Sequence, residues 1–354
     1  MAVNYRWLRY VLGGLAVVVI VYLEIMASSE TGVGEPLSSL QQSPLLENDT
    51  TSSVQDTTQA STTTVANDTA TTTVPPTGAS KYILKYMNRP GFVIENPGLC
   101  RGNGSLLRVV ILVTSAPDHE RHRMAIRYTW GHFSTRRDVV IAFFLGAVES
   151  ITRQKALQEE SDMYGDMIQS QNVDRYRRLP LKTLSLLQWV DEHCPGARFV
   201  LKTDDDMFIN VPELLRFVEE RDAARNTIFG QLARGWKPNR SLDSKYRVSR
   251  DELPGSVLPD FTTGPAYLMT GDVVRRMYLA ALDRRFVPLE DVLFTGLIAR
   301  DLGINKVHSS KFHPGFGNSK AEDCRRKASI SIHDVRYEQQ FVFWSRLLDG
   351  TLKC

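Results

Sequence analysis

Asp204, Asp205 and Asp206 directly follow an apolar run and carry the clearest chemical signal in the chain. Adjacent carboxylates repel one another, and this repulsion is costly unless a positive group lies beside them. In an extended segment Asp204 and Asp206 face the same way, and their oxygens suit a hard divalent cation, Mn²⁺ or Mg²⁺, that bridges to a diphosphate. The alternative is a solvated loop in which the aspartates only favour a turn. Their position after a predicted strand favours the cation site.

Glu290 and Asp291 form a second acidic group, at the start of a predicted amphipathic helix that runs to about Leu302 and stops at Gly303. Acidic residues in a first helical turn ordinarily complement the helix dipole. A carboxylate at a helix start that faces a cleft also suits a general base that removes a proton from a sugar hydroxyl. The local sequence leaves both interpretations open.

Two further segments give weaker signals. Gly264 lies in a stretch of small residues that either lets a substrate approach the backbone or forms a turn before a strand at 267–270. His333 lies in an alternating, strand-like stretch, and nothing in the residues alone favours it over His308 or His313 as a ligand. Local sequence therefore assigns neither segment a role.

The elements that must position these residues follow from periodicity. Leucines at helical spacing predict a helix over 181–190, and Asn210 predicts the cap of another. Strands that alternate with helices indicate an α/β fold with a mostly parallel sheet, in which ligands bind at the carboxyl ends of strands. Continuous apolar runs predict three buried strands of that sheet, at 108–113, 139–145 and 198–203.

The composition is that of a mainly globular protein, with 42% hydrophobic and 23% charged residues among 354. The formal net charge is only +3 and no basic stripe is present, so we expect no nucleic-acid partner. The four cysteines fit two disulfides in an exported chain or four thiols in a cytosolic one. None lies in a C-x-x-C pair, which argues against a zinc site.

Residues 7–26 are apolar apart from Arg9 and Glu24. A bilayer core takes about 20 such residues, so we expect a signal-anchor here. Arginines precede this segment and glutamates follow it, which predicts a cytoplasmic tail at 1–6 and a type II, single-pass topology with the rest lumenal. The alternatives are a cleavable signal peptide, which also leads into the secretory pathway, and a buried helix.

Residues 27–80 show no periodicity and are rich in threonine, which predicts a disordered lumenal stem before a folded domain at 81–354. Threonine together with proline indicates an O-glycosylated stalk, although an undecorated linker would have the same mechanical role. Four N-x-S/T sequons would be lumenal in this topology, at Asn48, Asn67, Asn103 and Asn239.

Over roughly 107–354 the chain resembles the inverting β-1,3-galactosyl- and β-1,3-N-acetylglucosaminyltransferases. Five motifs occur in the order of that family, and together they are far more specific than any one alone. They are R-x-x-I-R-x-T-W-G at 123–131, L-K-T at 181–183, F-V-L-K-T-D-D-D-M-F-I-N at 199–210, G-x-x-Y at 264–267 and E-D-V-x-x-x-G at 290–296.

The resemblance implies a GT-A fold that binds a UDP-sugar with Mn²⁺, or Mg²⁺ as the alternative. It places the metal on Asp206 and His333, and the catalytic base on Asp291, with Glu290 beside it. It also implies the disulfides Cys100–Cys194 and Cys324–Cys354. The residues that it places on the donor side are Arg123, Arg127, Lys202, Asp204, Asp205 and Gly264.

The expected activity is transfer of a hexosyl unit, galactose in preference, from a UDP-sugar to the 3-hydroxyl of a glycan on a glycoprotein or glycolipid in the Golgi membrane. Transfer of N-acetylglucosamine is the alternative, and a catalytically silent lumenal glycan-binding protein is the alternative from another class. Departures from the family pattern at 174–180 and 263–267 leave the chemistry intact but bear on donor and acceptor preference. The sequence indicates no oligomeric state.

Overall fold

The computed structural model describes residues 79–313 and 320–350. These residues belong to one of the two units into which the chain divides, Thr71–Cys354. The expected tail at 1–6, anchor at 7–26 and nearly all of the stem lie outside the described residues and stay predictions. Within the two described ranges, no helix is both long and apolar enough to cross a membrane.

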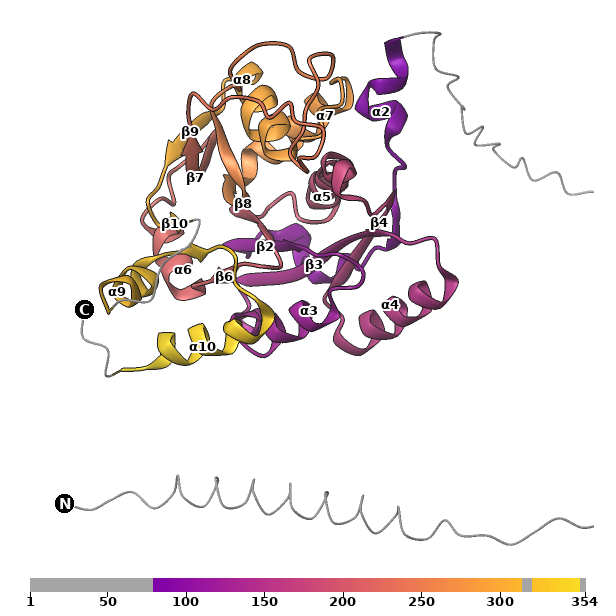
Figure 1. Ribbon diagram of the computed structural model, residues 1–354. Coiled ribbons are helices and arrows are strands. Elements are labelled where there is room, and N and C mark those ends of the chain that lie inside the picture. Colours follow the sequence, from indigo (N-terminus) through magenta and orange to yellow (C-terminus); the bar gives the residue numbers. More distant parts are fainter. Residues whose placement is uncertain (1–78, 314–319, 351–354) are drawn as a thin grey trace, which may run out of the picture. The chain divides into compact units, whose positions relative to one another are not determined.

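The centre of this unit is an eight-stranded sheet with the order β1-β4-β3-β2-β5-β8-β7-β9 (Figure 1). A separate small sheet has the order β10-β11-β6. The strands of the large sheet are β1 (Phe92–Ile94), β2 (Val109–Thr114), β3 (Val139–Ala147), β4 (Met167–Val173), β5 (Phe199–Asp204), β7 (Thr227–Ala233), β8 (Phe261–Thr270) and β9 (Asn305–His308). Those of the small sheet are β6 (Phe208–Ile209), β10 (Phe312–His313) and β11 (Ser331–Ile332).

The large sheet is mixed, which corrects the expected mostly parallel arrangement. Strands β4, β3, β2 and β5 run parallel to one another, and β9 runs parallel to β7. However, β8 is antiparallel to both β5 and β7, and β1 is antiparallel to β4. Residues 266–269 of β8 are apolar on both faces whichever way the strand points, so their composition does not reveal its direction. The three strands predicted from apolar runs are confirmed with nearly the same ends.

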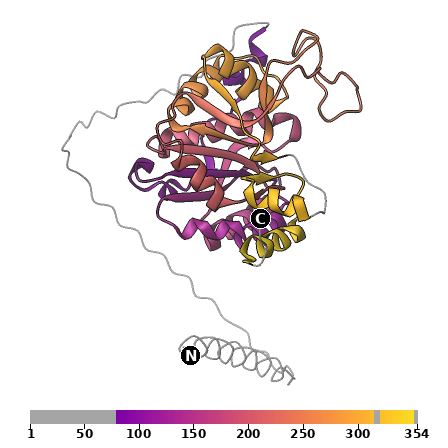
Figure 2. The same cartoon turned by 90° about the vertical axis from the view of Figure 1, so that its left-hand side faces the viewer.

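Two hydrophobic cores cover the two faces of the sheet, because successive side chains of a strand point to opposite faces. Val110 and Leu112 of β2 join the core under α5 and α7, whereas Val109, Ile111 and Val113 join the core with α3 and α6. Figures 1 and 2 show helices on both sides of the strands, with α10 beside α3. The sheet edge that carries the aspartates is therefore held rigidly from both sides.

The helices end and begin at residues with clear local reasons. Helix α5 contains Pro180 in its first turn, buries nearly its whole length, and ends at Cys194, which forms a disulfide with Cys100. The side chain of Asn210 accepts a hydrogen bond from Glu213 N and so caps α6 as expected. The α-helices are α2 (Leu84–Met87), α3 (Glu120–Arg127), α4 (Ile151–Tyr164), α5 (Leu179–His193), α6 (Val211–Glu219), α7 (Val274–Leu282), α8 (Ala299–Asp301), α9 (Lys320–Ala328) and α10 (Tyr337–Leu348).

The predicted amphipathic helix after Asp291 differs in type. It is a π-helix, η7 (Val292–Ile298), that continues into the short α8, and Gly303 ends it with a positive φ of 63°. Nearly all of η7 is buried, so packing rather than amphipathic spacing determines its geometry. The 3₁₀-helices are η1 (Ala79–Tyr82), η2 (Pro97–Leu99), η3 (Arg101–Gly104), η4 (Trp130–Thr135), η5 (Tyr176–Arg178) and η6 (Gly271–Val273).

Candidate active site

The three aspartates separate at the end of β5. Asp204 is the last residue of the strand and accepts hydrogen bonds from Thr114 Oγ1 at 2.6 Å and Lys202 Nζ at 2.5 Å. The carboxylate of Asp205 is buried elsewhere, where it accepts from Ser115 Oγ at 2.7 Å and lies 2.9 Å from His119 Nδ1. Asp205 therefore anchors the end of β5, while its neighbours point to other partners.

Asp206 meets His333 through the small sheet. Ile332 pairs with Phe208 in the antiparallel β11–β6 ladder, and Val335 N donates to Asp206 O, so His333 is brought alongside Asp206. His333 Nε2 lies 3.4 Å from Asp206 Oδ2. The hydrogen bond and charge of Asp206 raise the pKa of His333. Burial would raise the pKa of Asp206, but the imidazole outweighs it and the pKa lies below its usual value.

The Asp206–His333 pair fits a divalent metal. Asp206 Oδ1 is buried and has no hydrogen-bond partner in the part of the chain that the structure describes. A buried carboxylate oxygen without a partner costs about 1–3 kcal/mol or more, which a bound cation would offset. One carboxylate oxygen and one imidazole nitrogen suit Mn²⁺ better than Mg²⁺, which prefers oxygen ligands. These side chains would supply two ligands to such an ion.

Lys202 joins the aspartates to the glycine segment. Its ammonium, on a side chain that is nearly inaccessible, donates to Asp204 Oδ1 at 2.5 Å and to the carbonyl of Gly264 at 2.8 Å. Glu290 Oε2 lies 3.9 Å away. Burial alone would lower the pKa of Lys202, but the charges of Asp204 and Glu290 hold it above its usual value. Lys202 is thus a fixed cation between two acidic groups.

Glu290 and Asp291 differ in exposure and in partners. Glu290 is buried and accepts a 2.6 Å hydrogen bond from the Tyr267 hydroxyl. Burial, together with repulsion from Asp291, raises the pKa of Glu290 to about 7 against the attraction of Lys202. Asp291 is half-buried, and its two oxygens accept from Val292 N at 2.8 Å and Gly264 N at 3.0 Å. Burial raises the pKa of Asp291 as well, although these backbone bonds oppose the shift.

A cleft of about 450 Å³ brings together two of the candidate residues, Asp291 and His333. Asp291 from the start of η7 and His333 from the end of β11 both line it, whereas Glu290 does not. Such a volume is that of an ordinary small-molecule site. Asp291 therefore caps its helix and also lines a cleft, as the general-base interpretation requires, and its catalytic role stays a prediction. The aromatic wall of the cleft, Trp236 and Tyr246, was not predicted because it lies in an irregular loop.

The two arginines of the first motif are engaged inside the protein. Arg123 is fully buried, and its five N–H groups donate to Glu160, Ser115 Oγ and the carbonyls of Ala116 and Pro117. A bound donor would find none of them available. Since Ser115 Oγ donates to Asp205, Arg123 acts on the aspartates through that hydroxyl.

Arg127 pairs with Glu160 at 2.7 Å and Asp166 at 2.7 Å, and its cation lies 4.0 Å from the ring centroid of Tyr164. It shares Glu160 with Arg123, and its described partners do not include any of the three aspartates. Its observed contacts join α3 to α4 and β4, and the expected contact with a donor stays a prediction.

Sequence reasoning overlooked a second buried lysine. Lys182 donates to the carbonyl of Ser115 at 3.0 Å and pairs with Asp174 at 2.6 Å. Its position in the L-K-T motif at 181–183 was the available signal. Tyr267 and His119 were also not singled out, although the former ends the G-x-x-Y motif. All three help to hold the loops around the aspartates.

The disulfide Cys100–Cys194 is confirmed. Cys324 is also disulfide-bonded, but Cys354 lies outside the described residues, so that pairing stays a prediction. Of the four sequon asparagines, Asn103 and Asn239 are exposed, and Asn239 also lines the cleft. Asn48 and Asn67 lie outside the described residues.

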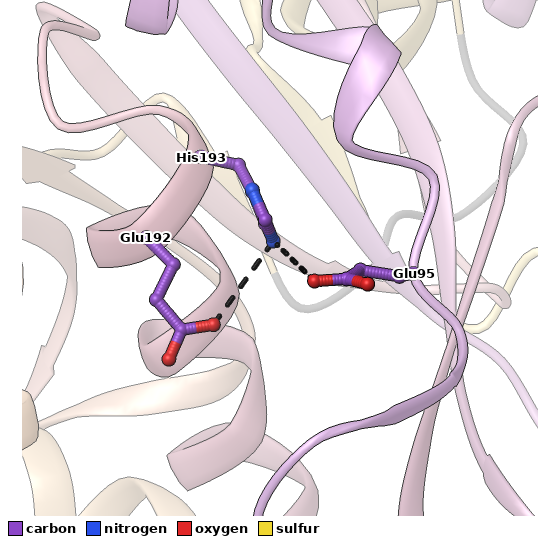
Figure 3. Close-up of side chains that lie close together, drawn as sticks. All are labelled: Glu95, Glu192 and His193. Atoms are coloured by element: carbon purple, nitrogen blue, oxygen red, sulfur yellow. Dashed lines mark ion pairs between the residues drawn. The ribbon is translucent and has the colours of Figure 1, made fainter. Parts of the chain in front are cut away.

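One other group of metal-ligating side chains is found among the described residues (Figure 3). His193, the last residue of α5, lies 3.2 Å from Glu95 Oε1 and 4.0 Å from Glu192 Oε2. Both carboxylates are exposed, and an exposed ion pair of this kind contributes little to stability. The group adjoins the Cys100–Cys194 disulfide rather than the cleft, and we assign it no role.

Comparison with known proteins places this site in a family context. The galactosyltransferase family model matches residues 121–310. Over 281 residues the chain is 34% identical to β-1,3-galactosyltransferase 5 of Pan paniscus, which covers 76% of this chain and 92% of the relative. Over 269 residues it is 29% identical to N-acetyllactosaminide β-1,3-N-acetylglucosaminyltransferase 4 of Mus musculus, with 74% and 75% covered. A solved galactosyltransferase, LgtC with donor and acceptor sugar analogues, gives a TM-score of 0.36 at 9% identity, with 68% and 96% covered.

Proposed function

The chain belongs to the galactosyltransferase family, and from that premise we propose that it is an inverting β-1,3-glycosyltransferase of the GT-A type. It moves a hexose from a UDP-sugar to the 3-hydroxyl of a glycan on a glycoprotein or glycolipid. Galactose is the favoured donor sugar, in keeping with the galactosyltransferase relatives, and N-acetylglucosamine is the alternative.

One observation carries this proposal: the carboxylate of Asp291 is fixed by two backbone N–H groups on the wall of the cleft that His333 also lines. Each Asp291 oxygen receives one hydrogen bond, so each retains a lone pair for a substrate hydroxyl. The pKa of Asp291 is raised, which makes its carboxylate a better proton acceptor at neutral pH.

In the proposed reaction Asp291 accepts the proton of the acceptor 3-hydroxyl as that oxygen forms a bond to C1 of the donor sugar. The bond from C1 to the β-phosphate oxygen breaks on the opposite face, and UDP leaves with the electron pair. Inversion at C1 follows from this single displacement. Asp206 and His333 would hold Mn²⁺, which supplies positive charge beside the departing diphosphate.

The remaining residues of the site hold these groups in place. Lys202 links Asp204 to Gly264, and Gly264 in turn donates to Asp291, so the donor side and the base are joined by a chain of hydrogen bonds. Glu290 is buried behind Asp291 and bonded to Tyr267, and we assign it a supporting role. Asp204 and Asp205 contribute charge and rigidity toward the donor.

We also propose the Golgi membrane as the setting, with residues 7–26 as the anchor and 27–80 as the stem. This part of the proposal rests on the apolar and threonine-rich segments of the sequence.

A donor screen of the full-length chain tests the activity. We expect UDP-galactose or UDP-N-acetylglucosamine, with Mn²⁺ and a β-glycoside acceptor, to yield UDP and a new β-1,3 linkage that NMR identifies. Free sugar in place of a disaccharide would identify a hydrolase instead. Glycan binding without UDP release would identify a catalytically silent glycan-binding protein.

A further inference from the structure

The loop 234–260, between β7 and β8, forms one wall of the cleft. The structure describes this loop in full, and it contains no helix or strand. It projects from the side of the folded unit (Figure 2). Five of its residues line the same cleft as Asp291: Trp236, Lys237, Asn239, Tyr246 and Leu258. Trp236 and Tyr246 are each about half exposed. An exposed aromatic face beside a base is a surface on which a sugar ring stacks.

The side chain of Arg240 holds distant parts of the loop together. Its guanidinium donates to four main-chain carbonyls of the loop, at distances of 2.7–3.0 Å, which are those of Val248, Ser249, Leu253 and Gly255. Glu252 is held as well, because it accepts from Ser249 N at 2.8 Å and its own N–H donates to Ser249 Oγ. The central part of the loop, on which Tyr246 lies, is thus held together by its own hydrogen bonds.

This part of the loop is tied to the segment 174–178, which comes from a distant part of the chain. Arg177 Nη1 donates to the carbonyl of Arg247 at 3.1 Å, and Nη2 donates to Glu252 Oε1 at 2.9 Å. Beside this link the rings of Tyr176 and Tyr246 meet edge to face with centroids 6.5 Å apart. Lys245 Nζ lies over both rings, 5.6 Å and 4.9 Å from their centroids.

The charges of Asp204 and Asp291 act on Tyr176. Burial, the neighbouring Tyr246, and the charges of Asp204 and Asp291 all raise the pKa of Tyr176. Because Tyr246 itself lines the cleft and Tyr176 packs against it, the contact between segment and loop is part of the environment of the cleft. It also lies in the stretch 174–180, where the sequence departs from the family pattern.

We infer that Arg177 is a positioning residue that holds the 234–260 loop against the cleft, so that Tyr246 and Trp236 bind the glycan acceptor and set the choice among acceptors. The inference rests on the proposed function, since it takes the group that Asp291 deprotonates to be an acceptor hydroxyl. The ligand class is a β-linked glycan that extends past its terminal sugar and reaches the aromatic wall.

Variants at this link should fold normally, because an exposed ion pair contributes at most about 1 kcal/mol. The side chains of Arg177 and Glu252 are 47% and 27% exposed. Arg175 offers a matched control: it belongs to the same segment but pairs with Glu149, outside the loop. A charge swap, Arg177→Glu with Glu252→Arg, restores the attraction between the two side chains but not the bonds of Arg177 to Arg247 O and of Glu252 to Ser249 N.

The experiment compares the full-length wild type with R175A, R177E, E252R and the double variant R177E/E252R. Methyl β-lactoside and methyl β-galactoside are the probes, and KM for acceptor, KM for the UDP-sugar, kcat and calorimetric Kd for each glycoside are measured. We expect R177E and E252R to raise KM and Kd for the lactoside about tenfold, and those for the galactoside less. KM for the UDP-sugar should stay within about twofold, and the double variant should bind the lactoside more tightly than either single variant does.

The inference is overturned if R177E binds the lactoside as R175A does, or if the UDP-sugar KM rises instead. A wild type that binds lactoside but transfers no sugar overturns the proposed function alone. The Kd values then still decide whether Arg177 positions the glycan-binding wall.

Discussion

The backbone N–H of Gly264 donates a 3.0 Å hydrogen bond to Oδ2 of Asp291 across 27 residues of sequence. The bond joins β8 to the first residue before η7 and leaves the carboxylate facing the cleft. A Cβ on Gly264 would lie 3.3 Å from that same oxygen, which is tighter than most such contacts. Glycine is thus needed here because of a close approach, whereas no unusual backbone angle requires it.

Replacing this glycine should therefore impair the reaction without unfolding the protein. We expect Gly264→Ala to displace the Asp291 carboxylate by a few tenths of an ångström and lower kcat about tenfold, since catalysis depends on such placement. Gly98→Ala is the control, because a Cβ there meets nothing within 4 Å. Equal kcat values for the two variants would show that Gly264 does not set the position of Asp291.

Asp291→Asn should abolish most of the transfer. The amide cannot accept the hydroxyl proton, and loss of a general base typically lowers the rate by about 10²–10⁴-fold. UDP binding, followed by calorimetry, should change little because Asp206 and His333 are untouched. Full turnover by this variant would remove Asp291 from the reaction.

Asp206→Ala and His333→Ala should each weaken the metal dependence. We expect the Mn²⁺ concentration for half-maximal activity to rise at least tenfold, and direct Mn²⁺ binding measured by electron paramagnetic resonance to fall in parallel. Because a proton competes with the metal for His333, affinity should also fall at lower pH. His308→Ala is the control, since His308 bonds to Leu232 N in the described part of the chain. An unchanged Mn²⁺ titration for His333→Ala would refute its assignment.

Glu290 should make the stability of the protein fall as pH rises. Its pKa is raised on folding from about 4.5 to about 7, so the folded state binds the proton more tightly than the unfolded state. The resulting stabilisation, about 3 kcal/mol at most, is fully present below pH 4.5 and is lost as pH rises through 7. The Glu290→Gln variant carries no titrating group at this position and serves as the control. As pH rises from 4.5 through 7, the melting temperature of the wild type should fall relative to that of this variant. Parallel profiles would show that Glu290 is not buried as described.

Asn239 should carry an N-linked glycan at the edge of the cleft, if the domain is lumenal as we propose. Its side-chain oxygen accepts from Ser241 N at 2.9 Å, and the residue is exposed. Ser241→Ala removes the sequon but keeps Asn239 itself, so we expect the loss of one glycan by mass and a lower KM for extended acceptors. An unchanged mass would mean that this sequon is not used.

Several features could be predicted because they are local. Continuous apolar runs mark buried strands, and leucine spacing marks α5, whatever the rest of the chain does. Asn210 caps α6 through a bond to a residue only three positions away. The order of the motifs along the chain likewise identifies the family, since order is a property of the sequence itself.

Other features depend on contacts between distant segments. Without the family resemblance, His333 could not be preferred over His308 or His313, because the choice is made by the β11–β6 register that lays it beside Asp206. The direction of β8 and the burial of Arg123 against Glu160 are decided in the same way.

The amino-acid sequence by itself thus determined the chemical groups, the family and most of the elements. Only the tertiary structure decided which of these groups face the cleft. Periodicity records which face of an element is apolar, but not which other element covers that face. Asp291 and Glu290 are neighbours with nearly the same local signal, yet one lines the cleft and the other is buried against Tyr267. The packing of η7 on β8 makes that distinction.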